Sequence, residues 1–252
     1  MQPIISVQNL VKKYGEFEAV KSISFEVFEG EIFGLLGPNG AGKSTTLEII
    51  ETLRTKTSGT VTVAGFDLDK KAVEIKKIIG VQLQSSGFYP GLNLVELINL
   101  FNGLYNQNVN ALELLDKVNL RDKAKAKVKE LSGGQKQRFS IATTLINTPK
   151  IIFLDEPTTG LDPQARRNLW DLIKQIQSEG TTVIITTHYM DEAELLCDRV
   201  AIIDEGKIIS LATPDKLIDD LVATGFEKPK EVKQANLEDV FIHLTGRSIR
   251  ED

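Results

Sequence analysis

The sequence is poor in the residues that build disulfides and zinc sites. Its 252 residues include one cysteine and two histidines, so no internal disulfide can form and no Cys/His cluster has zinc-ligand spacing. Long apolar runs are also lacking: residues 151–154, among the longest, fall far short of the ~20 residues that cross a bilayer. These absences exclude a disulfide scaffold and a zinc module, and they predict that any membrane-spanning part belongs to another polypeptide.

An excess of basic residues is missing as well. Lys and Arg total 30 against 35 Asp and Glu, a formal net charge of −5. Proteins that hold nucleic acid by its phosphates carry a broad basic surface, so we expect no nucleic-acid partner. Residues 1–10 show no basic segment followed by an apolar one, which predicts a cytoplasmic chain. Any phosphate that is bound must therefore be bound by a local site.

The apolar pattern of the first fifty residues predicts strands followed by a helix. Residues 4–27 alternate at strand spacing around a break at Tyr14-Gly15, which indicates an N-terminal antiparallel β-subdomain. Residues 32–36 have the character of a buried strand that enters a glycine-rich loop, and residues 44–53 have helical length and spacing. The sequence therefore predicts a strand–loop–helix unit at this place.

The rest of the chain predicts an α/β fold with a largely helical middle third. Strand and helix alternate after Pro149, which favours buried parallel strands, and a turn at 204–207 predicts an antiparallel hairpin at the end of the sheet. A charged segment and an amphipathic helix over 237–244 follow Pro214. The expected strands here are 61–63, 78–83, 151–154, 183–187, 200–203 and 208–211, and the expected helices are 93–105, 110–118 and 164–177.

The glycine-rich loop fits the P-loop pattern, and it stands between a predicted strand and a predicted helix as that pattern requires. Its glycines let backbone N–H groups turn toward phosphate oxygens, and the helix N-terminus adds positive potential. Lys43 can reach the β and γ phosphates, and Ser44 can ligate Mg²⁺. A glycine-rich turn without a ligand is the alternative, which the strand–helix context disfavours. The predicted nucleotide-binding residues are Gly37, Pro38, Asn39, Gly40, Ala41, Gly42, Lys43, Ser44 and Thr45.

Two carboxylates follow the predicted strand 151–154. In open α/β sheets ligands bind at the carboxyl ends of the strands, which is where Asp155 and Glu156 stand. Asp155 can hold Mg²⁺, and Glu156 can orient or deprotonate a water in line with the γ-phosphate. Taken alone, an Asp-Glu pair after a strand is more often a solvated turn or a helix cap. The P-loop upstream favours the catalytic interpretation.

A second phosphate-binding loop is predicted at Leu131, Ser132, Gly133, Gly134 and Gln135. Ser132 is a candidate N-cap for a helix that begins near Gln135, and the two glycines let backbone amides approach an oxyanion. The loop can be a plain helix cap, or it can close on a γ-phosphate held by another molecule. Two copies related by a two-fold axis would then each supply the loop that the other lacks. We expect a head-to-tail dimer with ATP between the copies.

With these motifs in this order, the chain resembles the ATP-binding subunit of ABC transporters over residues 4–211. The resemblance implies a P-loop NTPase with a RecA-like parallel sheet core and an inserted helical subdomain. It implies that Tyr14 stacks on adenine, that Gln84 links the Mg²⁺ site to the helical subdomain, that Asp162 couples two ATP sites and that His188 contacts the γ-phosphate. The domain is expected to span residues 4–213, with the helical subdomain at about 86–148 and a short extension at 214–252.

The resemblance also implies a function. Such a subunit binds ATP and Mg²⁺, pairs with a second ATP-binding subunit and powers a separate membrane-spanning permease from the cytoplasmic face of the cell membrane. The partner is expected to be an identical chain, with a paralogue as the open alternative. Residues 236–246 resemble the tail of subunits that serve type-2 exporters of drugs, lipids or polysaccharides, which favours export. An amphipathic helix that merely covers a sheet edge is the alternative for that tail.

Two rival classes of function compete at the sequence level. A soluble ABC protein acting on ribosomes or DNA usually has two such domains or a long coiled-coil insertion, and neither is present. A nucleotide switch without turnover would lack counterparts of Glu156 or His188, and both residues are here. Residues 87–92 form an apolar loop that suits a groove for a permease helix, although a locally packed loop remains possible there.

Overall fold

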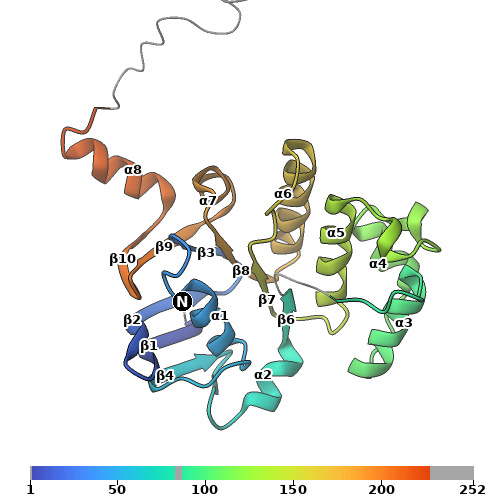
Figure 1. The fold of residues 1–252 in the computed structure, drawn as a ribbon, viewed down its shortest axis with the longest axis horizontal. Coiled ribbons are helices and arrows are strands. Elements are labelled where there is room, and N and C mark those ends of the chain that lie inside the picture. Colours follow the sequence, from blue (N-terminus) through green and yellow to red (C-terminus); the bar gives the residue numbers. More distant parts are fainter. Residues whose placement is uncertain (1, 83–86, 228–252) are drawn as a thin grey trace, which may run out of the picture. The chain divides into compact units, whose positions relative to one another are not determined.

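The computed structural model describes residues 2–82 and 87–227, and the chain divides into two units, Met1–Lys216 and Leu217–Asp252 (Figure 1). Gln84 and the predicted helix over 237–244 lie outside the described residues. Among the helices that are described, none combines the length and apolar character needed to cross a bilayer.

Two sheets build the first unit. The N-terminal sheet has four strands in the order β2-β1-β4-β5, and β1 pairs antiparallel with both β2 and β4. This confirms the predicted antiparallel β-subdomain and its break after Tyr14, which lies opposite Phe17 across a two-residue turn. The strands are β1 Pro3–Tyr14, β2 Phe17–Phe28, β4 Ser58–Val63 and β5 Phe66–Asp67.

The second sheet has six strands in the order β10-β9-β3-β8-β7-β6. Its neighbours are parallel except for the final pair, β9 and β10, which forms the predicted antiparallel hairpin. Buried Ile, Leu and Phe side chains fill β3 and β7, as expected of parallel strands covered on both faces. The strands are β3 Ile32–Leu36, β6 Ile79–Gln82, β7 Ile151–Asp155, β8 Thr182–Thr187, β9 Arg199–Asp204 and β10 Lys207–Ala212.

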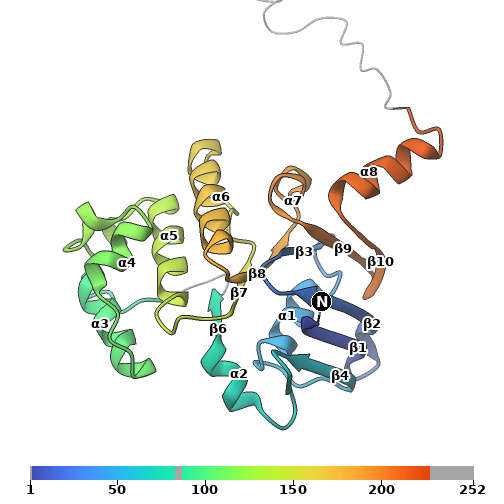
Figure 2. The ribbon, with the colours of Figure 1, turned by 180° about the vertical axis from the view of Figure 1, so that it is seen from behind.

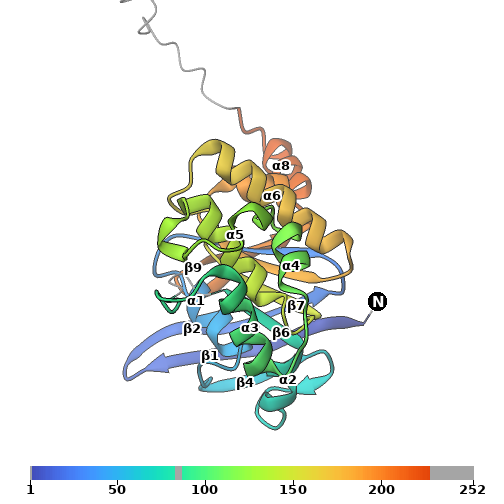
Figure 3. The same cartoon turned by 90° about the vertical axis from the view of Figure 1, so that its right-hand side faces the viewer.

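Three helices from the middle of the chain pack against one another and form a group of their own. Figures 1 and 2 show α3, α4 and α5 together at one side of the unit, away from β1 and β2, and Figure 3 shows that side facing the viewer. The helices are α1 Lys43–Ile50, α2 Ala72–Ile78, α3 Leu94–Tyr105, α4 Ala111–Lys117, α5 Gly133–Thr144, α6 Pro163–Ser178, α7 Met190–Leu196 and α8 Pro214–Ala223, with 3₁₀ turns at Arg121–Lys123 and Val128–Glu130.

The helix starts follow side-chain caps. Asn93, Asn110, Ser132 and Asp162 each accept a backbone N–H bond from the first turn of the helix that follows. The helix expected at 44–53 ends at Ile50 instead, because the chain turns into left-handed backbone at Thr52, with φ of 63°. Helix α2 went unpredicted, because its seven residues provide little periodicity to detect, and helix α8 went unpredicted as well.

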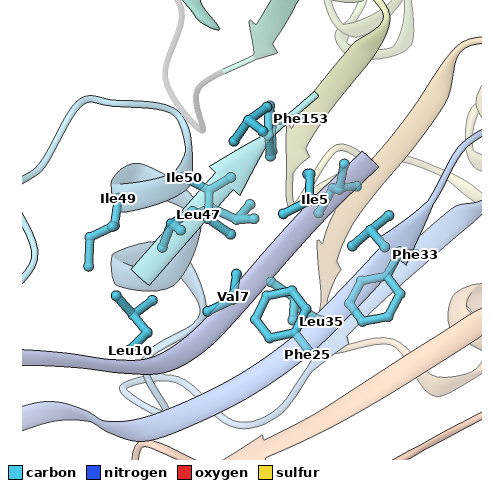
Figure 4. Packing of buried hydrophobic residues seen from close by; sticks show 14 of the residues in the cluster. Ile5, Val7, Leu10, Phe25, Phe33, Leu35, Leu47, Ile49, Ile50 and Phe153 are labelled. Carbon is cyan, nitrogen blue, oxygen red and sulfur yellow. The ribbon is translucent and has the colours of Figure 1, made fainter. Parts of the chain in front are cut away.

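One apolar cluster joins both sheets to α1, the helix that follows the P-loop (Figure 4). Within it the rings of Phe25 from β2 and Phe33 from β3 stack with centroids 5.5 Å apart. The cluster leaves the P-loop little freedom, because the elements before and after it are both packed in the core. Side chains labelled in Figure 4 are Ile5, Val7, Leu10, Phe25, Phe33, Leu35, Leu47, Ile49, Ile50 and Phe153.

A buried carboxyl stands at the end of α1. Glu51 is 3% exposed, and burial, with the nearby Asp155 and Glu48 carboxylates, raises the pKa of Glu51 from 4.5 to about 8. The folded chain therefore keeps a proton that the unfolded chain releases near pH 4.5. The contribution of Glu51 to stability must fall as the pH rises from about 4.5 to about 8, and it stays constant above that range.

Glu51→Gln is therefore expected to raise the free energy of unfolding at pH 8 by on the order of 1–3 kcal/mol, because the amide keeps the shape without the buried charge. The gain should disappear near pH 4, where the carboxyl is neutral in both states. Urea titrations of the nucleotide-free chain at both pH values check this. Glu194→Gln, on the exposed surface of α7, is the control that should change neither value. Equal stabilities of Glu51→Gln and the original chain at pH 8 would contradict the prediction.

Candidate functional site

The P-loop opens onto a cleft of about 430 Å³, a volume in the range of small-molecule sites. The loop leaves β3, and β8 and β7 are the next two strands of the same sheet, so three neighbouring carboxyl ends meet at this edge. The structure brings eight of the predicted site residues together around the cleft. Its lining consists of Tyr14, Phe17, Ala19, Asn39, Gly40, Gly42, Lys43, Ser44, Thr45 and Glu156.

Lys43 is held inside the P-loop. Its Nζ donates to the carbonyl oxygen of Gly37 at 2.8 Å and to that of Pro38 at 3.1 Å, and the residue is 5% exposed. Ala41 is buried in the apolar cluster, so its side chain faces the core. A Cβ on Gly37 would lie 2.0 Å from the Ile203 carbonyl oxygen, which explains why this position has no side chain. The loop thus offers backbone amides and one cation to an anion.

A hydroxyl and a carboxylate lie side by side at the start of α1. Ser44 Oγ is 3.4 Å from both carboxylate oxygens of Asp155, and the Thr186 hydroxyl donates to Asp155 as well. Carboxylate and hydroxyl oxygens are the ligands that Mg²⁺ prefers, and this ion usually takes one or two protein carboxylates with substrate phosphates. Ser44 and Asp155 therefore fit an Mg²⁺ ion.

Glu156 and His188 meet at the same edge. Glu156 Oε1 lies 3.3 Å from His188 Nδ1, and the Glu156 side chain is 13% exposed against 37% for His188. Glu156 has left-handed backbone, with φ of 46°, and its N–H donates to the Thr186 hydroxyl at 3.0 Å. Such backbone costs free energy for a residue with a side chain, and it is common at functional sites. The bond from Glu156 N–H to Thr186 helps to hold this conformation.

Two residues of the site were not singled out in the sequence. Thr186 bonds both Asp155 and the backbone of Glu156, but a threonine inside an apolar strand gives no signal of this. Phe17, 64% exposed, lines the cleft beside Tyr14, its cross-strand neighbour. The short turn after Tyr14 was a usable signal for Phe17, because a two-residue hairpin turn places its flanking residues opposite each other.

Tyr14 stands at the open end of the cleft, where it is 41% exposed. Lys12 Nζ lies 5.0 Å from the centroid of its ring, and Arg54 Cζ lies 5.4 Å from it. Arg54 is in turn paired with Glu48 at 2.5 Å. A ring flanked by cations in this way is restrained, which suits a platform for a flat base.

The loop of Ser132, Gly133, Gly134 and Gln135 is a helix cap in this chain. Ser132 Oγ accepts the N–H of Gln135 at 3.3 Å, and the Gln135 side chain accepts the N–H of Ser132 at 2.9 Å. A Cβ on Gly134 would lie 2.8 Å from Cβ of Ala165, so the loop packs against the start of α6.

Asp162, the N-cap of α6, accepts the N–H of Ala165 at 2.9 Å. Neither Asp162 nor any of the four residues of the Ser132–Gln135 loop is among the described residues that line the P-loop cleft of the same chain.

Comparison with known proteins identifies the family. Residues 20–159, more than half of the chain, match the family described as "ABC transporter". The match includes the P-loop, the Ser132–Gln135 loop and the Asp155-Glu156 pair.

Relatives with assigned names cover most of the chain. The linearmycin resistance ATP-binding protein LnrL of Bacillus subtilis strain 168 is 41% identical over 219 residues, 85% of this chain and 70% of the relative. The Nod factor export ATP-binding protein I of Burkholderia orbicola strain AU 1054 is 35% identical over 299 aligned positions, 98% of this chain and 98% of the relative.

The fold matches solved ATP-binding cassettes. One of them, a dimer in a post-hydrolysis state bound to ADP and Pi, superposes with a TM-score of 0.74 at 30% identity, over 83% of this chain and 98% of the cassette. Together with the P-loop cleft and the Glu156–His188 pair, these similarities decide the family. The chain belongs to the ATP-binding subunits of ABC transporters, which are ATPases with the P-loop NTPase fold.

Proposed function

We propose that this chain powers export by a separate membrane-spanning permease, which it joins from the cytoplasmic face of the cell membrane. Two relatives support this direction, because their names assign them to Nod factor export and to linearmycin resistance. Their similarity covers 98% and 85% of this chain, so it extends beyond the motifs that all ATPases of this kind share. It favours the exporter over a soluble ATPase acting on ribosomes or DNA, and the acidic net charge of −5 disfavours a nucleic-acid partner.

The observation that carries the catalytic part is the 3.3 Å approach of Glu156 to His188 at the edge of the P-loop cleft. The P-loop amides and Lys43 hold the phosphates of ATP, and Tyr14 stacks on the base. Glu156 takes the proton of the attacking water, and His188 donates a hydrogen bond to the γ-phosphate.

Mg²⁺ would be held by Ser44, Asp155 and Gln84, and it would neutralise charge on the phosphate oxygens. The Ser44–Asp155 approach supports the first two of these ligands. Asp155 keeps its position through the Thr186 hydroxyl, so a variant that lacks this hydroxyl would disturb the metal site and Glu156 together.

A second copy of the chain completes the site. The exposed Ser132 and Gly133 stand at the start of α5, where the positive end of the helix dipole favours an anion. Since this loop does not line the cleft of its own chain, a head-to-tail partner would bring it to the γ-phosphate, with Asp162 close to the junction. The dimeric state of the similar cassette supports this assembly. An identical chain is the simplest partner, and a paralogue is the alternative.

The helical group carries the surface for the permease. Phe88 is packed, with its ring 5.1 Å from that of Phe139 and 6.5 Å from that of Phe101. The predicted docking loop is therefore partly a locally packed one. Tyr89 and Leu104 are 68% and 70% exposed, and these side chains suit contact with a permease helix. The proposed helical subdomain spans about 86–148, and the extension 214–252 follows the domain of residues 4–213.

Purification of the tagged chain from solubilised membranes tests the transporter assignment. We expect a stoichiometric multi-span protein to co-purify, and its mass-spectrometric identity and topology should be those of an exporter. The double variant Tyr89→Ser, Leu104→Ser should lose this partner and keep ATP binding. Recovery with ribosomes or DNA, and with no membrane protein, would contradict the proposal while leaving the ATPase activity in place.

A further inference from the structure

A row of stacked side chains leads from the start of α6 to the candidate catalytic pair. Arg166 Cζ lies 4.5 Å from the centroid of the Tyr189 ring. The Tyr189 ring lies 4.2 Å from the His188 ring, with an angle of 37° between the planes. His188 Nδ1 is the atom that approaches Glu156 Oε1 at 3.3 Å. Contacts of side chains therefore run without a gap from Arg166 to Glu156.

The far end of this row is anchored. Arg166 is in the first turn of α6, its side chain is 21% exposed, and it pairs with Asp191 at 3.6 Å. One turn further along α6, Trp170 Nε1 donates to the buried Glu192 at 3.0 Å. Asp191 and Glu192 both belong to α7, which begins two residues after His188. Helices α6 and α7 are thus joined at two levels, and Arg166 has little freedom to leave the Tyr189 ring.

At the other end of the row, the His188 side chain needs contacts that hold its orientation. The His188 side chain is 37% exposed and stands outside both β8 and α7, so secondary structure does not limit its rotamers. The Tyr189 ring restricts the imidazole by stacking on it, and the Arg166 guanidinium over the Tyr189 ring restricts that ring in turn.

We propose that Tyr189 is a positioning residue for His188, and that Arg166 makes the position of this ring depend on α6. Helix α6 begins at Asp162, the residue expected at the junction of the two ATP sites, so a shift of its N-terminus reaches the imidazole through Arg166 and Tyr189. This inference rests on the proposed role of His188 in hydrolysis. The two residues act through the imidazole and contact no reacting atom.

Steady-state ATP hydrolysis by the full chain is the first test. Tyr189→Leu should lower kcat by about tenfold, with KM for ATP changed by less than about twofold, because a misplaced group costs rate more than binding. Tyr189→Phe keeps the ring and should turn over at the original rate. Arg166→Met should lower kcat, and the double variant Arg166→Met, Tyr189→Leu should be no slower than Tyr189→Leu alone, because both act through one contact.

The matched control is Arg167→Met, the next residue of α6, which is exposed and should leave kcat unchanged. A rate for Tyr189→Leu equal to that of Tyr189→Phe would overturn the proposal. The proposal would also be overturned if the decrease in kcat of the double variant equalled the combined decreases of the two single variants.

The orientation of the His188 imidazole can be measured by NMR, independently of ATP hydrolysis. The chain has two histidines, so a His243→Gln background leaves the ring protons of His188 as the sole imidazole signals in an NMR spectrum. The Tyr189 ring current should shift these signals in the original chain and in Tyr189→Phe, and the shift should be lost in Tyr189→Leu. His188 signals that are the same in all three would overturn the stack.

His188→Ala separates this inference from the proposed function. Unchanged hydrolysis by His188→Ala would contradict both the proposed role of His188 in hydrolysis and the positioning role of Tyr189. Slow hydrolysis by His188→Ala, with an unaffected Tyr189→Leu, would overturn the positioning role alone.

Discussion

Replacing Glu156 with glutamine is expected to slow ATP hydrolysis by about 10²–10⁴-fold, the usual contribution of a positioned general base. The amide keeps the size of the side chain and can still bond His188 Nδ1 and the Thr159 hydroxyl, which approach the two carboxylate oxygens at 3.3 and 3.4 Å. It cannot accept the proton of the attacking water. ATP binding should therefore be unchanged while turnover falls.

The same variant should accumulate the ATP-bound dimer, because ATP bridges the two copies and is no longer consumed. Single-turnover hydrolysis with Mg²⁺, equilibrium binding of ATP and size-exclusion chromatography with and without ATP measure the three effects. Glu194→Gln on the exposed surface of α7 is the control, and it should hydrolyse ATP at the original rate. If Glu156→Gln bound ATP and still turned over at the original rate, the assignment of the base would be wrong.

Replacing Lys43 with methionine is expected to weaken ATP binding by about 100-fold. Lys43 is buried, its ammonium group is held by the P-loop carbonyls of Gly37 and Pro38, and it lines the cleft proposed for the phosphates. A hydrogen bond to a charged group contributes about 1.5–3 kcal/mol, and 1.4 kcal/mol corresponds to a factor of ten in affinity. A methionine side chain is nearly as long as that of lysine and is uncharged, so it should fill the same space and the loop should keep its shape.

Calorimetric titration with ATP and Mg²⁺ measures this loss. Thermal unfolding of the same sample shows whether the fold persists, and Lys76→Met, an exposed change in α2, is the charge-matched control. An unchanged dissociation constant for Lys43→Met in a folded chain would exclude Lys43 from phosphate binding.

The local elements of the fold were predictable from the sequence. The strand 32–36 and its loop were assigned correctly, since five buried residues, four of them with apolar side chains, and a glycine-rich loop leave few other conformations. The antiparallel hairpin at residues 204–207 was also predicted, because turn residues between two apolar runs are a local signal. Helix α8 was missed, although Leu217, Ile218, Leu221 and Val222 recur at helical spacing, because the charged residues between them suggested a solvated segment.

The sequence by itself determined the phosphate-binding part of this protein. Gly37, Lys43 and Ser44 belong to a stretch of eight neighbouring residues, so the phosphate-binding role proposed for them could be predicted from a local pattern. The order of the motifs along the chain is likewise sufficient to identify the family, because each motif is a short run of neighbouring residues.

Only the tertiary structure decided which distant side chains meet. Glu156 follows β7 and His188 follows β8, and they approach within 3.3 Å because Asp155 pairs with Thr186 in the parallel register of these strands. The contacts of Phe17 with the cleft and of Arg166 with Tyr189 depend in the same way on pairing and packing between elements. Periodicity in a sequence reports which face of an element is buried, but not which neighbour covers it, because many partners bury the same apolar area equally well.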